Sequence, residues 1–246
     1  MRAAVIPAII LVGGVGSRLR PVTGDLPKPM APVAGRPFLA WLIEFLRGSG
    51  LDRIVLSAGY GAETIRDHFG NGADLGLTIS YSVEQQLLGT GGAIKQGAGL
   101  IADDRFLVLN GDSFAQINLE AFQAFHRQHG GPLSLALVRV KDAGRFGAVD
   151  IDGRTGEIRA FDEKQKSGGS LINAGMYLME RRVADAIPAG VVSFERDVLP
   201  GLLKRSGETS KAYGFPVDGF FVDIGVPEDY RKLVDNPAPL LQACRS

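Results

Sequence analysis

A short apolar run that leads directly into a glycine-rich turn opens the chain. Residues 8–12 read AIILV, and residues 13–16 read GGVG. Similar runs of β-branched and aliphatic residues recur at 53–57, 77–83 and 105–110, with helix-like stretches between them. Strands that are covered on both faces are apolar at nearly every position. This alternation therefore predicts an α/β fold: a doubly wound, Rossmann-like mixed sheet with helices on both faces.

The stretch after the first predicted strand has the spacing of an amphipathic helix. Phe38, Leu42, Phe45 and Leu46 fall at i, i+4, i+7 and i+8, and Pro37 stands just before them. Such a stripe buries one helix face against a sheet. We therefore expect a helix that begins near residue 38 and connects two parallel strands.

The second half of the chain has a different texture. Its apolar runs, at 133–140, 146–152, 157–164 and 171–179, are joined by turns such as DGRTG rather than by long helices. This spacing predicts a small, β-rich and partly antiparallel extension. We expect it to cover one side of the ligand cleft that a doubly wound sheet forms at the carboxyl ends of its strands. No repeat or long flexible linker interrupts the sequence, so residues 1–246 are expected to form a single domain.

The charge balance limits the partners. The chain has 27 Lys and Arg residues against 27 Asp and Glu residues, so no global basic field attracts nucleic acid or an anionic membrane. No segment approaches the roughly 20 apolar residues of a membrane helix. Pro7 interrupts the apolar start, which favours a strand over a signal peptide. A lone cysteine, Cys244, fits a reducing compartment, and we expect a cytoplasmic protein.

The opening glycine turn fits neither of the two common phosphate-binding motifs. A dinucleotide fingerprint through Gly14 and Gly16 fails at Leu19, and the Gly-Lys-Ser/Thr of a P-loop is absent. What remains is a turn whose bare N–H groups can approach a phosphate, followed by Arg18. Lys28 stands ten residues later, between two prolines that stiffen the loop. The sequence thus predicts a phosphate site of another kind.

Two aspartates end apolar strands and are candidates for a metal site. Asp112 follows VLNG, and Asp223 follows FFV. Either residue alone could cap a helix or a turn. Together they offer what Mg²⁺ uses beside phosphate, namely one or two carboxylates. A D-x-D motif is missing, because position 114 is Phe114.

The full opening string, G-G-x-G-S-R-L-x-P-x-T-x-x-x-P-K-P at residues 13–29, resembles the signature of the sugar-phosphate nucleotidylyltransferases. The resemblance continues in order along nearly the whole chain, through EQQLLGTGGAI, NGDS, FDEK, INAG and FVDIGVPEDY. It implies transfer of a nucleoside monophosphate from a nucleoside triphosphate to a sugar 1-phosphate, with release of pyrophosphate. It also implies the nucleotide-diphospho-sugar transferase fold, with residues 1–130 mainly binding nucleotide and residues 131–246 mainly binding sugar phosphate.

The resemblance also implies roles for individual residues. Arg18, Lys28 and Asp112 would be catalytic, and Asp112 and Asp223 would hold Mg²⁺. The nucleotide would be bound by Leu11, Gly13, Gly14, Gly16, Ser17, Arg18, Gln85, Gly89, Thr90, Gly91 and Gly92. The sugar phosphate would be bound by Gly147, Glu163, Lys164, Asn173 and Gly175.

Within the family, four stretches resemble the heptose 1-phosphate guanylyltransferases: LPKPMAPVAGRPFL, LGTGGAIK, SFERDVLP and GFFVDIGVPEDY. They favour GTP and D-glycero-α-D-manno-heptose 1-phosphate. Mannose-1-phosphate guanylyltransferases and nucleotidylyltransferases that use UTP or dTTP with a hexose or muramate 1-phosphate share most of these motifs and stay open. A catalytically silent regulatory subunit is a further alternative, and assembly into a homo-oligomer is open.

Overall fold

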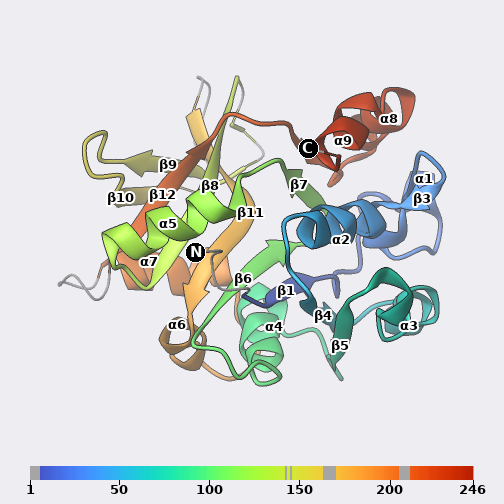
Figure 1. Ribbon diagram of the computed structural model, residues 1–246, viewed down its shortest axis with the longest axis horizontal. Coiled ribbons are helices and arrows are strands. Elements are labelled where there is room, and N and C mark those ends of the chain that lie inside the picture. The colour runs from blue at the N-terminus through green and yellow to red at the C-terminus, as the bar shows by residue number, and fades with distance from the viewer. Residues whose placement is uncertain (1–5, 142, 145, 163–169, 205–210, 246) are drawn as a thin grey trace.

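The computed structural model describes residues 6–245 except 142, 145, 163–169 and 205–210. Its main feature is a nine-stranded mixed sheet, whose longest path of neighbours runs β10-β9-β11-β6-β1-β4-β5. Strands β8 and β12 extend this sheet from β11. Helices lie around the sheet (Figure 1). The predicted fold class, a doubly wound mixed sheet with a β-rich extension, is confirmed.

Four parallel strands form the first half of the sheet. They are β1 (Ala8–Leu11), β4 (Arg53–Ala58), β5 (Thr78–Val83) and β6 (Arg105–Asn110), and all four predicted strands are confirmed. From β1 the chain moves outward through β4 to β5, and it then returns to place β6 on the other side of β1. Such a reversal of strand order leaves a crevice at the carboxyl ends of the two central strands.

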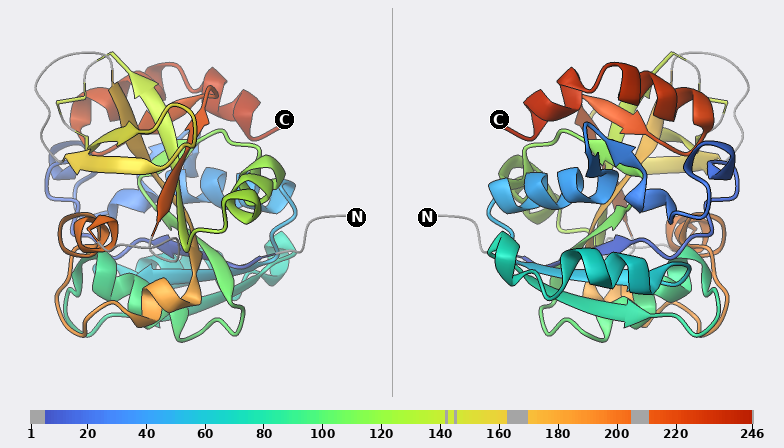
Figure 2. Two further views of the ribbon diagram at one scale, coloured as in Figure 1. Left: turned by 90° about the vertical axis from the view of Figure 1, so that its left-hand side faces the viewer. Right: turned by 90° about the vertical axis from the view of Figure 1, so that its right-hand side faces the viewer.

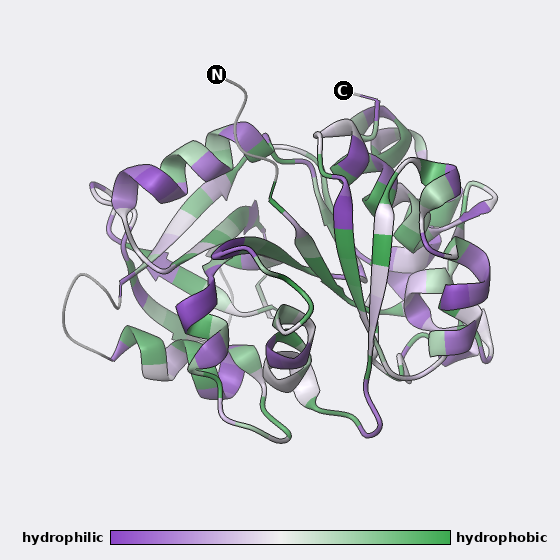
Figure 3. Ribbon diagram, turned by 60° about the horizontal axis from the view of Figure 1, so that its bottom comes forward, coloured by the Kyte–Doolittle hydropathy of each residue, from purple (hydrophilic) through white to green (hydrophobic). Residues whose placement is uncertain are grey.

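Helices cover both faces of these strands. Helices α2 (Phe38–Gly48) and α3 (Ala62–Phe69) share a core cluster with Ile10 of β1, whereas α4 (Gly89–Ala98) shares a second cluster with Ile9. Successive strand residues point to opposite faces, so both faces of β1 are buried. In Figure 3 much of the strand ribbon is green, with white and purple stretches, and the helices mix green and purple. Helix α2 begins where the sequence predicted it.

The second half of the sheet is largely antiparallel. Strand β11 (Ser170–Glu180) pairs antiparallel with both β6 and β8 (Leu133–Val140). It also meets β9 (Ala148–Ile151), which pairs with β10 (Ile158–Asp162), while β12 (Ala212–Val217) runs parallel to β8. Figure 2 shows β9, β10 and β12 facing the viewer in its left-hand view, and α2 and α3 in its right-hand view.

The remaining elements are short or peripheral. Helix α5 (Leu119–His129) precedes β8, with its first turn capped by the Asn118 side chain. The small strand pairs are β2 (Pro32–Val33) with β3 (Arg36–Pro37), and β7 (Ser113–Ala115) with β13 (Phe221–Asp223). The other helical segments are α1 (Arg20–Thr23), η1 (Lys28–Met30), η2 (Ala73–Leu75), α6 (Arg181–Asp185), the π-helix η3 (Phe194–Val198), α7 (Leu199–Leu203), α8 (Pro227–Asp235) and α9 (Ala238–Ala243). No described helix is long and apolar enough to cross a membrane.

Strand β11 carries an irregularity in its middle. Asn173 pairs with Leu137 of β8, but Tyr177 pairs with Leu135, so the three intervening residues of β11 oppose a single residue of β8, and β11 has two extra residues. Gly175 lies inside this irregularity with a φ of 72°. Extra residues of this kind bend a strand and redirect its side chains, often beside a functional site.

Candidate active site

A cavity of about 410 Å³ lies at the carboxyl ends of β1 and β6, where the topology predicts a crevice. Most of the residues predicted to bind nucleotide line it. They are Leu11, Gly13, Gly14, Gly16, Ser17, Arg18, Gly89 and Thr90, joined by the catalytic candidates Lys28 and Asp112. We call this space the first cavity.

Three predicted nucleotide-binding residues are not part of this lining. Gln85 is exposed and lies outside it. Gly91 donates its backbone N–H to the carbonyl of Val192 at 2.8 Å. A Cβ at Gly92 would stand 2.6 Å from the carbonyl oxygen of Gly190. The two glycines therefore let the start of α4 pack closely against residues 190–192, and contact of these three residues with the base stays a prediction.

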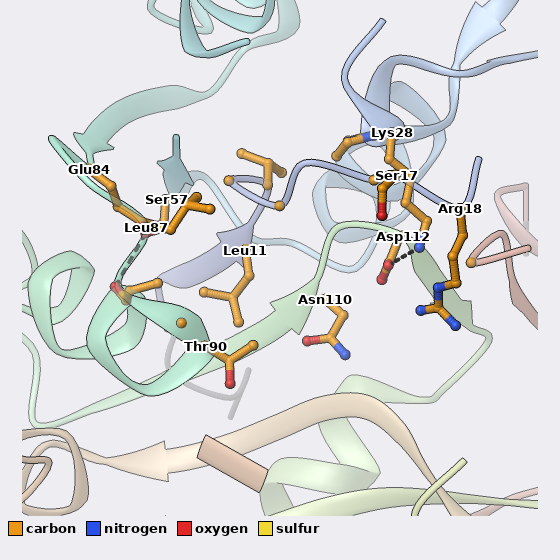
Figure 4. A pocket seen from close by; sticks show the side chains of 18 residues that line it. Leu11, Ser17, Arg18, Lys28, Ser57, Glu84, Leu87, Thr90, Asn110 and Asp112 are labelled. Carbon is orange, nitrogen blue, oxygen red and sulfur yellow. Dashed lines mark hydrogen bonds and ion pairs between the residues drawn. The ribbon is translucent and has the colours of Figure 1, made fainter. Parts of the chain in front are cut away.

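One end of the first cavity is positively charged. Gly16 has a φ of 63°, and a Cβ there would stand 2.9 Å from Cβ of Lys28, so only glycine lets the two loops approach this closely. Lys28 is 8% exposed, whereas Arg18 is exposed and has no ion pair or hydrogen-bonding partner for its guanidinium among the described residues. In Figure 4 both cations lie beside Asp112.

Asp112 and Asp223 are close together, as predicted for a shared site. Pairing of β7 with β13 sets Asp223 opposite Ser113. The Ser113 hydroxyl lies 2.8 Å from Oδ2 of Asp223, which accepts its proton, and 3.4 Å from Oδ1 of Asp112. Lys28 donates to the other oxygen of Asp112. A buried ammonium group and two carboxylates thus meet at one point.

The electrostatics of Asp223 reflect this crowding. Burial raises the pKa of its carboxyl group, and the negative charge of Asp112 raises it further. The Lys28 ammonium group and hydrogen bonds from Ser113 and from the Gly225 backbone lower the same pKa. Two partly buried carboxylates facing each other are stabilised by a cation between them. Their oxygens are also the ligands that Mg²⁺ prefers, so this pair fits a magnesium ion that also binds phosphate.

A second cavity, of about 220 Å³, adjoins the first. Asn110 lines both, and Asp223 lines the second while Asp112 lines the first. Three residues predicted to bind sugar phosphate line the second cavity, namely Gly147, Asn173 and Gly175. The other two, Glu163 and Lys164, lie outside the described residues.

Backbone geometry shapes the second cavity. A Cβ on Gly175 would stand 2.6 Å from the amide nitrogen of Asn110, and one on Gly147 would stand 2.4 Å from the ring of Phe161. Because Gly175 also has a positive φ, it is fixed as glycine for two independent reasons. The irregularity in β11 brings Asn173 to the cavity and packs Gly175 against Asn110.

The sequence analysis missed several residues that line the two cavities. Glu84 and Leu87 lie at the end of the first cavity away from Arg18 and Asp112 (Figure 4). Glu84 accepts a hydrogen bond from the Leu88 backbone at 2.8 Å, and burial raises the pKa of its carboxyl group. Glu195 lines the second cavity. Glu84 directly follows the strand predicted at 77–83 and precedes the GTGG turn, and this position could have marked it as a candidate site residue.

Comparisons with known proteins agree with this geometry. The family model described as nucleotidyl transferase matches residues 7–237. The chain is 40% identical to a mannose-1-phosphate guanylyltransferase of Mycobacterium tuberculosis, over 92% of this chain but only 62% of that protein. It is 39% identical to a D-glycero-alpha-D-manno-heptose 1-phosphate guanylyltransferase of Aneurinibacillus thermoaerophilus, over 92% of this chain and 95% of that protein.

A solved structure shares the fold over nearly the whole length. The crystal structure of HddC from Yersinia pseudotuberculosis complexed with GMP-PN superposes with a TM-score of 0.82 at 35% identity, covering 94% of this chain and 98% of that one. The matched family model, these relatives and the crevice lined by a glycine turn and paired aspartates lead to one conclusion: the chain belongs to the nucleotidyl transferase family.

Proposed function

We propose that this protein transfers GMP from GTP to a sugar 1-phosphate and releases pyrophosphate. The observation that carries this proposal is the meeting of the two cavities at Asn110 and the Asp112–Asp223 pair. An oxygen of the sugar phosphate attacks the α-phosphorus of GTP, a new P–O bond forms, and the bond to the leaving pyrophosphate breaks. The first cavity holds the triphosphate, and the second holds the incoming sugar phosphate.

The chain's own residues stabilise the charge that develops during this step. Lys28 is buried, held by its loop and directed at Asp112, so its ammonium group lies close to the reacting phosphate. The guanidinium of Arg18, which has no partner among the described residues, lies at the same end of the cavity and binds the departing pyrophosphate. Mg²⁺ held by Asp112 and Asp223 would neutralise part of the negative charge on the phosphates. The phosphate monoester is already an anion near neutral pH, so no general base is required.

Glu84 supports guanine as the base. Its carboxylate lines the cavity at the end away from the phosphate-binding cations, where a base would lie. A carboxylate accepts hydrogen bonds, and guanine presents two neighbouring donors, its N1–H and its N2 amino group. Uracil and thymine have a single ring N–H between two carbonyl groups. The curated relatives named above are guanylyltransferases, which supports the same choice.

The sugar is proposed to be D-glycero-α-D-manno-heptose 1-phosphate. The relative from Aneurinibacillus thermoaerophilus, of which this chain covers 95%, is named for this substrate. Mannose 1-phosphate is the alternative, because the relative from Mycobacterium tuberculosis is named for it. We further propose that Lys164 and Glu163 bind the phosphate and the hydroxyl groups of the sugar, as the family motif implies. The two halves, 1–130 and 131–246, then serve one substrate each within one domain, in the cytoplasm.

Pyrophosphate release with a panel of substrates tests this proposal. The purified protein is incubated with Mg²⁺, with GTP, UTP or dTTP, and with heptose, mannose or glucose 1-phosphate. GTP with heptose 1-phosphate should give the highest kcat/KM. A clear preference for UTP or dTTP would contradict the assignment of guanine to the Glu84 end. A protein that binds nucleotide but releases no pyrophosphate with any pair would be a silent regulatory subunit.

A further inference from the structure

We propose that Glu195 is a positioning residue shared by the two substrate cavities, an inference that rests on the proposed function. Glu195 lies on the π-helix η3, a wide helical turn of a kind that is frequent at functional sites. It also lines the second cavity. Each of its two carboxylate oxygens accepts a hydrogen bond, one from Thr90 and the other from Tyr177. We call the hydrogen bonds through Thr90 the first arm of this network and those through Tyr177 the second arm.

The first arm of this network reaches the nucleotide side. The hydroxyl group of Thr90, which lines the first cavity, donates to Oε2 of Glu195 at 2.7 Å. The backbone N–H of Phe194 donates to the same Thr90 oxygen at 2.8 Å. The proton of Thr90 is therefore already used, so this residue can offer a nucleotide only its methyl group or a remaining lone pair.

The second arm reaches the sugar side. Tyr177 on β11 donates its hydroxyl proton to Oε1 of Glu195 at 3.0 Å. The amide nitrogen of Asn173 donates to the Tyr177 oxygen at 2.6 Å, and the Asn173 carbonyl oxygen accepts the N–H of Gly175 at 3.0 Å. This arm fixes both the position and the amide orientation of Asn173 in the second cavity.

The direction of every proton in the network depends on the carboxylate. Only a group that accepts at both ends can receive the hydroxyl protons of Thr90 and Tyr177 at once, and an ionised carboxylate is such a group. No Lys or Arg forms an ion pair with Glu195 in the described part of the chain, so hydrogen bonds alone satisfy its charge there. Tyr177 is fully buried, which protects its arm from competition by water.

Two substitutions separate the two arms. Tyr177→Phe removes the hydroxyl of the sugar-side arm, and we expect it to raise the KM for sugar 1-phosphate about ten-fold while the Kd for GTP changes less than about two-fold. Thr90→Val removes the other arm and should weaken GTP binding by a similar factor without changing the KM for sugar phosphate. Titration calorimetry with GTP and Mg²⁺, beside steady-state kinetics in sugar phosphate, measures both.

Glu195→Gln is the sharpest variant, because it keeps the shape and changes only the hydrogen-bonding pattern. An amide accepts at one end and donates at the other, so it preserves one arm and inverts the other. Its kinetic profile should therefore reproduce that of either Tyr177→Phe or Thr90→Val. Glu195→Ala, which removes both contacts, should combine the two profiles.

A matched control excludes a purely structural role. Tyr81 on β5 donates to the Gly70 carbonyl at 2.7 Å and lines neither cavity, so Tyr81→Phe removes the same atom at a distant place. Both tyrosine variants should lower Tm, but only Tyr177→Phe should change the KM for sugar phosphate. If Tyr177→Phe and Glu195→Gln lower Tm and leave both substrate affinities unchanged, the inference is wrong. Wild-type turnover is measured first: an inactive wild type overturns the proposed function, whereas an active wild type with unaffected variants overturns only the inference.

Discussion

The two cavities are built in different ways. The first is lined mainly by segments that follow the ends of consecutive parallel strands, so its glycine turn, Glu84 and Asp112 occupy the places that the sheet gives them. The second combines segments far apart in the chain, from residue 110 to residue 223. Its shape depends on the irregular middle of β11 and on the β7–β13 pair. The regular order of the parallel strands thus forms the first cavity, whereas irregular backbone segments form the second cavity.

This difference indicates which kind of substitution each cavity tolerates. In the first cavity, which the regular sheet frames, function depends on charged side chains, so removing a charge should lower turnover while the fold persists. In the second cavity, function depends on the path of the backbone, so adding a single methyl group should affect both stability and sugar binding. The following predictions test this contrast, from the largest expected effect to the smallest.

Loss of either metal-binding carboxylate should have the largest effect. Asp112→Asn or Asp223→Asn should lower kcat by about 10³-fold, because each removes a charge that holds the cation on the reacting phosphates. The double variant should be little worse than either single one, since groups that act as a unit are not additive. Asp74→Asn, at an exposed acid on η2, is the control. Independent, multiplicative losses would contradict a shared ion.

Removing the two cations of the first cavity, Lys28 and Arg18, should lower kcat to different extents. Lys28→Ala should lower kcat by about 10²-fold, because this buried ammonium group is fixed beside the reacting phosphate and acts mainly in the transition state. Arg18→Ala, at an exposed side chain, should lower kcat less. Lys28→Arg should rescue poorly, since a planar guanidinium does not fit where a compact ammonium group is enclosed. Equal decreases in kcat for Lys28→Ala and Arg18→Ala would show that the burial of a cation does not determine its contribution to catalysis.

Adding one methyl group tests the second cavity. Gly175→Ala should raise the KM for sugar phosphate about ten-fold and reduce the free energy of unfolding by about 2 to 4 kcal/mol, from the positive φ and the contact with Asn110. Gly50→Ala is a matched control: its φ is 89°, but nothing lies within 4 Å of an added Cβ. Steady-state kinetics should show a raised KM for sugar phosphate only in Gly175→Ala. Urea unfolding measures the free energy of unfolding of both variants. An unchanged KM in that variant would mean that the irregularity of β11 does not shape the sugar site.

Sequence patterns predicted the regular half better than the irregular half. The four parallel strands were readable because their apolar runs and the glycine turn follow local rules, and the topology then locates the crevice. In the second half, β8, β9, β10 and β11 were also predicted, whereas β12 was not. Their register was not, because the two extra residues of β11 and the pairing of residue 223 with residue 113 depend on contacts between distant segments. This limit explains why the proximity of Asp223 to Asp112 rested on family resemblance.

The missed residues show the same limit at the level of side chains. Glu195 occurs in SFERDVLP, a stretch noted only as a subgroup feature, and nothing local distinguishes it from a surface acid. Its contacts with Thr90 and Tyr177 form because η3 packs against α4 and faces β11. Gly91 and Gly92 show a related limit: the family resemblance implies contact with the base, which stays a prediction, while the structure shows a packing role for both glycines. A glycine motif indicates close approach but does not say what approaches.

The smallest predicted effect tests whether the two halves unfold together. His126 on α5 is buried, and its Nδ1 lies 2.8 Å from the hydroxyl of Ser134 on β8, so this contact joins residues 1–130 to residues 131–246. Burial, reinforced by nearby arginines such as Arg105, lowers the pKa of His126 from 6.5 to about 4. The unfolded chain therefore binds the proton more tightly, and the stabilisation is complete above pH 6.5 and declines as the pH falls towards 4.

At pH 5 this linkage amounts to about 2 kcal/mol of lost unfolding free energy relative to pH 7. Because carboxylates also titrate in this range, the measured quantity is the difference between the wild type and His126→Gln, a variant that stays neutral. The wild type should lose about 2 kcal/mol more than His126→Gln between pH 7 and pH 5 in urea unfolding. If the halves form one domain, tryptophan fluorescence from Trp41 in the first half and circular dichroism from the whole chain should report the same shifted transition. Separate transitions, with only one of them sensitive to pH, would divide the chain at the boundary between α5 and β8.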